Sequence, residues 1–183
     1  DNIIDIGCGQ GYFLENLMVN KKKAFGIDLS VEQIKACEER NLNAKVIDLA
    51  DVKEKFDCAT AIFDVLNYIP KEDLKTFLTQ VNVVLNQGAY FIFDVNSLFG
   101  FEEVAQGCIT IDLEDKFISI DANFENNKLQ TNITLFTKEN GGLFSKESDS
   151  IIQEYHSKEF LRKLLKECNF EIQEIKKFNL HTD

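Results

Sequence analysis

The sequence predicts an α/β fold with a doubly wound, mainly parallel sheet and an inserted antiparallel β-meander. Three observations lead to this prediction. Short apolar runs alternate with segments of helical periodicity over the first 94 residues, a glycine-rich turn follows the first run, and apolar residues alternate with period two from about residue 108 to 144. The 183 residues, 44% of them hydrophobic, are enough for one globular domain.

The first two strands and helices follow from short patterns. Residues 2–6 form an apolar run typical of a strand buried on both faces, and apolar residues at helical spacing predict a helix from Tyr12 to Met18. A second strand is expected over 24–28. Ser30 then caps a helix that runs to about Arg40, because Gln33 stands at the capping-box position.

The alternation continues through the middle of the chain. Strands are expected over 44–48 and 58–63. A helix follows, with Pro70 near its start, an apolar stripe up to Leu85 and Gly88 as its stop. Residues 89–94 are the fifth strand, and right-handed crossovers would make all five parallel.

The pattern changes near Gly100. Three alternating segments, separated by polar turns at 125–127 and 140–142, predict the antiparallel meander. Helical spacing returns after Ser157, a probable N-cap, and Asn169 suits the left-handed position that closes this last helix. One more strand is expected over 170–178.

Three glycines follow the first strand, and they indicate a ligand that approaches the backbone closely. Gly7, Gly9 and Gly11 have no Cβ, so a polar ligand can reach the amides at the start of the first helix. Their spacing, G-x-G-x-G, lacks one residue of the dinucleotide fingerprint G-x-G-x-x-G, which argues against a nicotinamide or flavin.

With Asp5 in front, this loop reads DIGCGQG and resembles the first motif of the class I S-adenosylmethionine-dependent methyltransferases, which have a Rossmann-like fold. The resemblance covers residues 2 to about 96. It implies that the loop holds the amino-acid part of S-adenosylmethionine, that Asp28 binds the ribose hydroxyls and that Asp48 contacts the adenine amine. The cofactor-binding residues expected on this basis are Asp5, Gly7, Cys8, Gly9, Gly11, Asp28, Leu29, Asp48, Leu49 and Asp64.

The positions of these aspartates support the roles that the resemblance implies for them. Asp5, Asp28 and Asp48 come at or near the ends of three successive predicted strands, and ligands of open α/β sheets bind outside the carboxyl ends of the strands. Each aspartate alone could equally be a helix cap or a turn residue. The three together favour an adenosyl ligand.

The methyl-transfer end is predicted after the fourth and fifth strands. Asp64 and Tyr68 lie in the family's fourth motif and are candidate catalytic residues. The alternative role is that of a turn residue for Asp64 and of a packing residue for Tyr68. Asn96 is a candidate for orienting the acceptor. His156 is a candidate base, since imidazole exchanges protons near neutral pH, and its alternative is a surface histidine beside a helix cap. No role is assigned to His181.

The arrangement also resembles amino-sugar and glycine N-methyltransferase-like enzymes, in which an antiparallel sheet covers the active site. This implies one methyltransferase domain over 1–183, with a cofactor-binding core at 1–99, a β insertion forming a substrate lid at 100–156 and a return helix and strand at 157–183. Both ends look cut, since the first strand begins at residue 2, so flanking elements are expected to be missing.

Composition restricts the partners. A net charge of -11 disfavours nucleic acid and anionic membranes, and five scattered cysteines without a C-x-x-C pair favour a reducing compartment, the cytoplasm. No metal site and no membrane span is expected. The predicted function is methyl transfer to a nitrogen or oxygen of a small metabolite. The alternatives are a non-catalytic S-adenosylmethionine-binding regulatory module and a nicotinamide-dependent oxidoreductase; the oligomeric state is left open.

Overall fold

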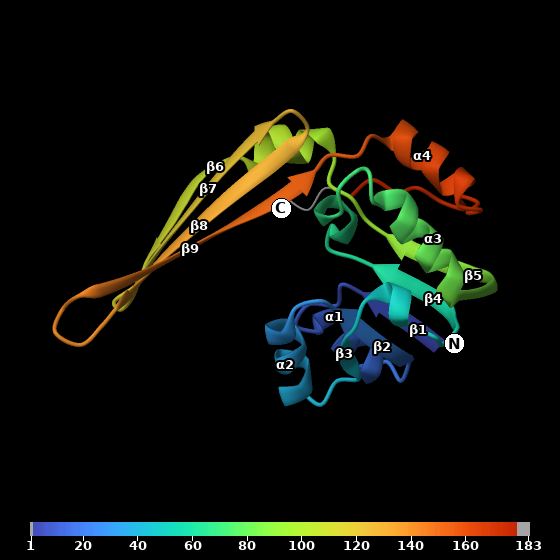
Figure 1. Cartoon of the computed structure of the whole chain (residues 1–183), viewed down its shortest axis with the longest axis horizontal. Helices are drawn as coiled ribbons and strands as arrows, with labels where there is room; N and C mark the ends of the chain where they lie inside the picture. The colour runs from blue at the N-terminus through green and yellow to red at the C-terminus, as the bar shows by residue number, and fades with distance from the viewer. Residues whose placement is uncertain (1, 179–183) are drawn as a thin grey trace.

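A computed structural model of the chain describes residues 2–178 and contains two separate sheets (Figure 1). The first has five parallel strands in the order β3-β2-β1-β4-β5, and the second has four antiparallel strands in the order β6-β7-β8-β9. This confirms the predicted fold class. The strands are β1 (Asn2–Ile6), β2 (Lys23–Asp28), β3 (Ala44–Val46), β4 (Phe56–Ala61), β5 (Leu85–Phe93), β6 (Gly107–Asp112), β7 (Lys116–Glu125), β8 (Lys128–Lys138) and β9 (Phe144–Glu154). The helices are α1 (Tyr12–Val19), α2 (Val31–Glu39), α3 (Leu74–Val84) and α4 (Lys158–Glu167), with short turns η1 (Leu49–Asp51), η2 (Val65–Tyr68) and η3 (Gly100–Ala105).

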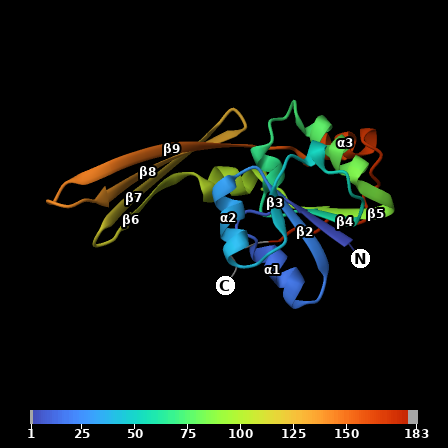
Figure 2. The same ribbon diagram turned by 60° about the horizontal axis from the view of Figure 1, so that its bottom comes forward.

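Helices cover both faces of the parallel sheet. Figure 2 shows α1 and α2 on the side of the sheet away from α3. The larger core cluster joins β1, β2, β4 and β5 to α3 and α4, and a smaller one on the other face joins Leu14 of α1 to Cys37 of α2. A parallel sheet is stable only when both faces are buried, which explains the continuous apolar runs of its strands.

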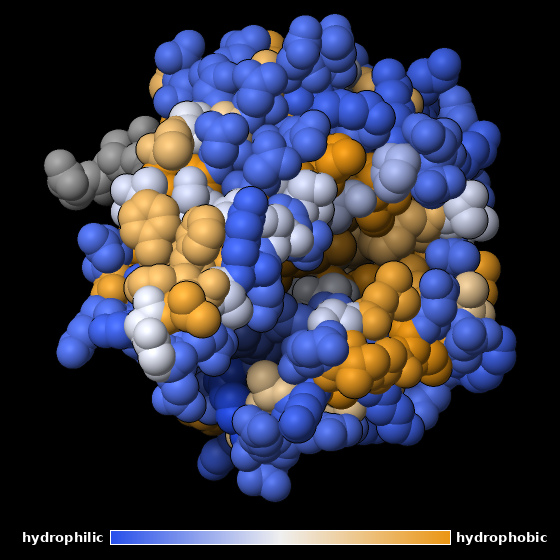
Figure 3. Space-filling view, turned by 60° about the vertical axis from the view of Figure 1, so that its left-hand side comes forward, coloured by the Kyte–Doolittle hydropathy of each residue, from blue (hydrophilic) through white to orange (hydrophobic). Residues whose placement is uncertain are grey.

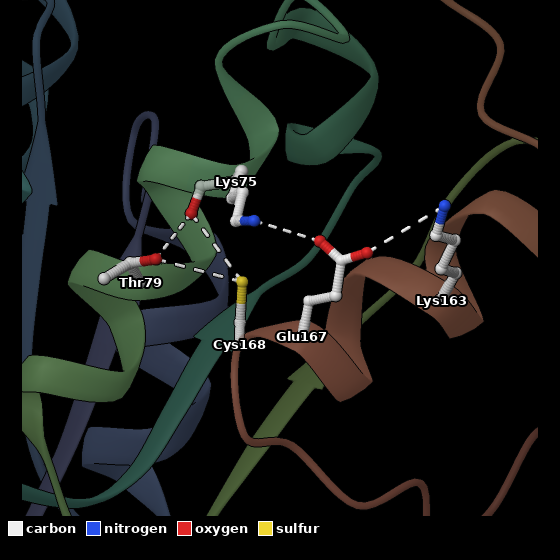
Figure 4. Close-up of polar contacts among 5 residues, drawn as sticks. All are labelled: Lys75, Thr79, Lys163, Glu167 and Cys168. Carbon is white, nitrogen blue, oxygen red and sulfur yellow. Dashed lines mark hydrogen bonds and ion pairs between the residues drawn. The ribbon is translucent and has the colours of Figure 1, made fainter.

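The last helix is fixed to α3 by packing and by a polar cluster at its C-terminal end (Figure 4). Lys75 Nζ donates to Glu167 Oε2 at 3.0 Å, and Lys163 Nζ lies 4.0 Å from the other carboxylate oxygen. The thiol of Cys168 lies 3.8 Å from both Thr79 Oγ1 and the carbonyl oxygen of Lys75. Leu161, Leu164 and Leu165 are buried beneath this cluster. The leucines supply most of the stabilisation, because exposed ion pairs contribute little.

The antiparallel sheet extends away from the parallel sheet as an arm (Figures 1 and 2). Its end nearest the core packs on η3, where Phe101 is fully buried against Ala122 and Leu129. The predicted turns at 125–127 and 140–142 are present, with Asn126 and Asn127 in left-handed conformations at the first. The meander was therefore predicted with the correct turns.

Several predicted bounds are wrong, and one predicted strand does not form. The strand expected over 58–63 is β4 (Phe56–Ala61), and the strand expected over 44–48 ends at Val46. Helix α3 ends at Val84 instead of near Gly88, and β5 already begins at Leu85. Gly88, with φ +78°, lies in an irregular stretch where the register between β4 and β5 shifts. Residues 170–178 form no strand, because no neighbouring strand pairs with them; Phe170 packs on Phe91 and the following residues are exposed.

Strand β9 and the short turns η1, η2 and η3 were not predicted. Strand β9 carries Lys146, Glu147 and Asp149, so its sequence shows no apolar alternation. It pairs with β8 on one side only, and charged residues are typical of such edge strands. The short turn η3 has a single buried residue, Phe101, which gives no periodicity to detect.

Candidate functional site

The glycine loop joins β1 to α1 and is tied to β2. The backbone amides of Gly7 and Cys8 donate to the carbonyl oxygen of Ile27 at 2.8 and 3.0 Å. Gly9 has φ +53°, and a Cβ built on it would meet nothing within 4 Å. A Cβ on Gly11 would lie 2.5 Å from Leu42 and 2.8 Å from the sulfur of Cys37. The loop therefore packs on α2 at Gly11 and faces open space at Gly9.

Asp28 lies at the end of β2, where the sequence predicts it, and connects the loop to α2. Its Oδ2 accepts from the amide of Gly9 and its Oδ1 from the amide of Ser30, both at 2.9 Å. Each oxygen of a carboxylate can accept a second hydrogen bond. Asp28 can therefore bind two neighbouring hydroxyl groups while it holds the loop in place.

Asp48 lies beyond β3 and is exposed. Its Oδ1 accepts from the amide of Ala50 at 2.8 Å and so caps η1. Leu49 points into the core at 7% exposure, which leaves only its backbone for a ligand, whereas Leu29 after β2 is 72% exposed. Asp28 and Asp48 follow paired neighbouring strands, since Asp28 is opposite Val46 in the β2–β3 register. The carboxylates of Asp28 and Asp48 thus lie beyond the ends of two adjacent strands.

Asp5 is buried beneath the loop and is 2% exposed. Thr60 Oγ1 donates to its Oδ1 at 2.7 Å. Burial, against the opposing hydrogen bond from Thr60 and with a smaller contribution from the carboxylate of Asp28, raises the pKa of Asp5 to about 6. A positive charge close to the carboxylates of Asp5 and Asp28 would be stabilised.

The thiol of Cys8 lies below the loop. Cys8 and Cys37 direct their sulfurs toward the carbonyl oxygen of Gly9, at 3.7 and 3.2 Å. Burial raises the pKa of both thiols, so both are neutral at physiological pH. Cys8 therefore offers a ligand its backbone.

A second group of polar residues surrounds Asp64, after β4. Asp64 has φ +55° and follows Phe63, which has φ +63°, so two successive non-glycine residues are left-handed. Its Oδ2 accepts from Asn96 Nδ2 at 3.0 Å and from Gln153 Nε2. Its own amide donates to Asp94 Oδ2 at 3.1 Å. Burial raises the pKa of Asp64, and the Asp94 carboxylate adds to the rise.

This arrangement brings together residues from β4, β5 and β9. Asp64 and Asn96 were predicted, but Gln153 was not singled out. Nothing in the sequence relates Gln153 to Asp64, because the pairing register of β9 sets its position. Asn67, also missed, is fully buried and joins the same elements: its Nδ2 donates to the carbonyl oxygen of Glu154 at 2.7 Å, and its Oδ1 accepts from the amide of Asn96 at 2.9 Å.

Tyr68 and His156 take different places around this group. Tyr68 is 51% exposed, and partial burial and the charge of Asp64 raise its pKa. His156 is 2% exposed, which excludes the alternative that it is a surface histidine beside a helix cap. Its Nε2 donates to the carbonyl oxygens of Leu66 and Ile69, at 3.0 and 3.2 Å, and burial lowers its pKa. His156 therefore holds η2 as a neutral ring.

The two groups of residues are neighbours. A Cβ on Gly7 would lie 2.9 Å from a methyl group of Val65, so the loop packs directly on η2. The glycine loop, Asp28 and the Asp64 group consequently line the same end of the parallel sheet. Among residues 2–178 no group of three or more histidine, cysteine or acidic side chains could hold a metal ion. In the same part of the chain no helix is long and apolar enough to cross a membrane.

Comparison with known proteins identifies relatives of this chain. A family model described as a methyltransferase domain matches residues 3–88. An uncharacterised protein of Methanocaldococcus jannaschii is 30% identical over 113 residues, which are 60% of this chain and 42% of that protein. A malonyl-[acyl-carrier protein] O-methyltransferase of Hamiltonella defensa is 26% identical over 128 residues, 65% of this chain and 48% of that protein. The chain thus spans less than half of either relative.

Solved structures show the same fold over the whole chain. A S-adenosylmethionine-dependent methyltransferase from Clostridium acetobutylicum superposes with a TM-score of 0.82 at 26% identity, covering 100% of this chain and 80% of that one. The amino pentose methyltransferase CalS10 of Micromonospora echinaspora, solved with S-adenosylmethionine bound, superposes with a TM-score of 0.68 over 91% of this chain and 74% of that one. At 14% identity the second likeness concerns the fold alone.

Proposed function

We propose that the chain is a class I S-adenosylmethionine-dependent methyltransferase that transfers the methyl group to a nitrogen or oxygen of a small metabolite, as its likeness to a methyltransferase-domain family and to a solved methyltransferase supports. The observation that carries the proposal is the adjacency of two sites. An open glycine loop with Asp28 suits the cofactor, and a buried carboxylate held by two amides lies beside it at Asp64.

The residues around the loop fit S-adenosylmethionine. Bound there, the cofactor supplies a methyl group already activated by the positive sulfonium. Asp28 would accept hydrogen bonds from the ribose hydroxyls, and Asp48 with the Leu49 backbone would contact the adenine. Gly9 leaves the space that a side chain would fill. The buried Asp5, with its raised pKa, would be stabilised by a cationic ligand.

Asp64, Asn96 and Tyr68 form the proposed acceptor end. S-adenosylmethionine bound beside them would supply the methyl group for an in-line displacement, so these residues would chiefly have to align the acceptor. Asn96 and Gln153 fix one oxygen of Asp64, which leaves the other oxygen to accept from an N–H or O–H of the acceptor. His156 acts as a positioning residue, because it anchors η2, the turn that carries Tyr68.

We further propose that the near end of the antiparallel sheet covers the acceptor. Gln153 of β9 reaches Asp64, and Asn67 of η2 donates to the β9 backbone at Glu154. The negative site and negative chain favour a neutral or cationic metabolite over nucleic acid. Free cysteines at all five positions agree with the reducing cytoplasm as its location.

A transfer assay with methyl-labelled S-adenosylmethionine and a panel of small amines and alcohols tests the proposal. Label should appear in one acceptor class, and Asp64→Asn should slow transfer by on the order of tenfold or more while cofactor affinity changes little. Asp51→Asn, an exposed aspartate of η1, is the matched control. Tight cofactor binding without transfer to any acceptor would instead support the regulatory module, and equal rates for the two variants would remove Asp64 from the mechanism.

A further inference from the structure

The arm carries an apolar face that the rest of the described chain leaves largely uncovered. Residues paired across antiparallel strands point to the same side of a sheet. One row joins Ile109, Ile120 and Ile133, and the next joins Ile111, Ile118 and Leu135. Ile109 and Ile111 are 62% and 41% exposed. Figure 3, in which this end of the molecule comes forward, shows apolar residues gathered in patches around a hollow.

The opposite face of the arm is mostly polar over the same length, with the pair Phe117 and Phe136 as its apolar exception. The row between the two apolar ones consists of Thr110, Ser119, Thr134 and Ser148, all with hydroxyl groups. The sheet is therefore amphipathic, with one face suited to water and the other to burial. Antiparallel sheets with this pattern are usually covered on the apolar side, and a single uncovered layer of four strands is only marginally stable.

Only the near end of the apolar face is covered within the described residues. There Phe101 of η3 packs on Ala122 and Leu129, and Gln153 reaches Asp64. Beyond that point the arm extends away from the parallel sheet, as both ribbon views show. Its far end adds Leu113, which is 52% exposed.

From this face we infer that two copies of the chain pack arm against arm, apolar face to apolar face. Strands about 4.8 Å apart and roughly seven uncovered residues long give an area of about 450 Å² per copy in projection. Two copies together approach the roughly 1,000 Å² expected of a specific interface. Two stacked sheets about 10 Å apart would form an ordinary β-sandwich.

The composition of the face favours a second copy over a transient partner. Its two central rows are entirely aliphatic on β6, β7 and β8, like one half of a domain core, and homodimer interfaces are more apolar than non-obligate ones. Transient interfaces are richer in arginine and aromatic residues. The two rows end on the edge strand β9 in Asp149 and Glu147, which would form the rim. The chain's charge of -11 opposes association, so added salt should strengthen the dimer.

Sedimentation velocity on the chain over a wide concentration range tests this inference. We expect the mass of two 21.0 kDa chains, and a tighter dimer at higher salt. Ile120→Asp should give monomers, whereas Ser119→Asp, its neighbour on the polar face, should leave the dimer intact. Unchanged binding of S-adenosylhomocysteine would show that the Ile120→Asp core is still folded.

Hydrogen exchange of β7 and β8 gives a second readout. In the dimer, their central amides should exchange more slowly at high protein concentration than at low concentration, and Ile133→Asp should abolish this difference. A folded wild-type chain that stays monomeric throughout the range would overturn the inference. So would an equal loss of dimer in Ile120→Asp and Ser119→Asp, because the apolar face would then have no special role.

Discussion

At the scale of single residues, the cofactor side of the site is built from carboxylates with different surroundings. Asp28 is half-buried and already accepts two backbone hydrogen bonds, whereas Asp5 is buried and accepts from Thr60. Burying a carboxylate without a positive partner costs free energy. The cost is acceptable at a site that binds a cation, because the ligand offsets it.

The raised pKa of Asp5 predicts a specific pH dependence. Its folded-state pKa, about 6, lies above the ordinary aspartate value of 3.8, so the folded chain binds a proton more tightly than the unfolded chain. The contribution of Asp5 to the free energy of unfolding should therefore fall between pH 4 and pH 6 and stay low above it. By the same shift, Asp5→Asn should stabilise the ligand-free chain at pH 8 by about 2 to 3 kcal/mol.

Urea unfolding at several pH values measures this effect. The difference in free energy between Asp5→Asn and wild type should grow from pH 4 to pH 6, while contributions from His156, present in both, cancel. Asp51→Asn serves as the exposed control. A difference that is the same at all pH values would contradict the assigned burial of Asp5.

Gly9 and Gly11 of the loop should behave differently on substitution. Gly9→Ala adds a methyl group into open space and should cost only about 1 to 2 kcal/mol of stability for its left-handed backbone. It should nevertheless weaken S-adenosylhomocysteine binding on the order of tenfold or more, because the ligand needs that space. Gly11→Ala would meet Leu42 and Cys37, and should cost more stability than Gly9→Ala.

Thermal unfolding and calorimetry on both variants check this prediction. The outcome that would count against the loop as the ligand site is a Gly9→Ala chain with normal stability and normal affinity for S-adenosylhomocysteine.

At the scale of elements, apolar packing positions the helices and polar contacts adjust them. The α3–α4 junction is an example, since buried leucines lie beneath the exposed Lys75–Glu167 pair (Figure 4). Glu167→Gln should cost little stability, because exposed ion pairs are screened by solvent. Leu164→Ala should cost about 2 to 5 kcal/mol through the cavity that it leaves. Urea unfolding curves measure both values, and a larger loss for Glu167→Gln than for Leu164→Ala would contradict this assignment.

Elements also show what the sequence can predict. The strands of the parallel sheet were predicted because burial on both faces makes their apolar runs continuous, and α2 and α4 because Ser30 and Ser157 cap them as expected. Strand β9 was missed because its charged edge hides the alternation, and the strand over 170–178 was expected although nothing pairs with it. Local patterns predict elements, but pairing partners decide whether a strand forms.

At the scale of the whole molecule, the difference between local patterns and long-range pairing also separates the glycine-loop side of the site from the Asp64 side. Asp28 and Asp48 follow strands whose order is set by the fold, so their common location could be inferred from sequence. The contact of Gln153 with Asp64 depends on residues 89 positions apart and on the register of the arm, which no local pattern encodes. The shared location of Asp28 and Asp48 was therefore predictable, whereas the contact of Gln153 with Asp64 was not.

The central claim is that an adenosyl ligand binds across the ends of β1, β2 and β3. Calorimetry with S-adenosylhomocysteine on wild type, Asp28→Ala and Asp51→Ala tests it most directly, with thermal unfolding to confirm that each chain is folded. We predict binding by wild type and Asp51→Ala, and a loss of about a hundredfold in affinity for Asp28→Ala. No binding to the wild-type chain, or equal affinity for all three folded chains, would contradict the claim.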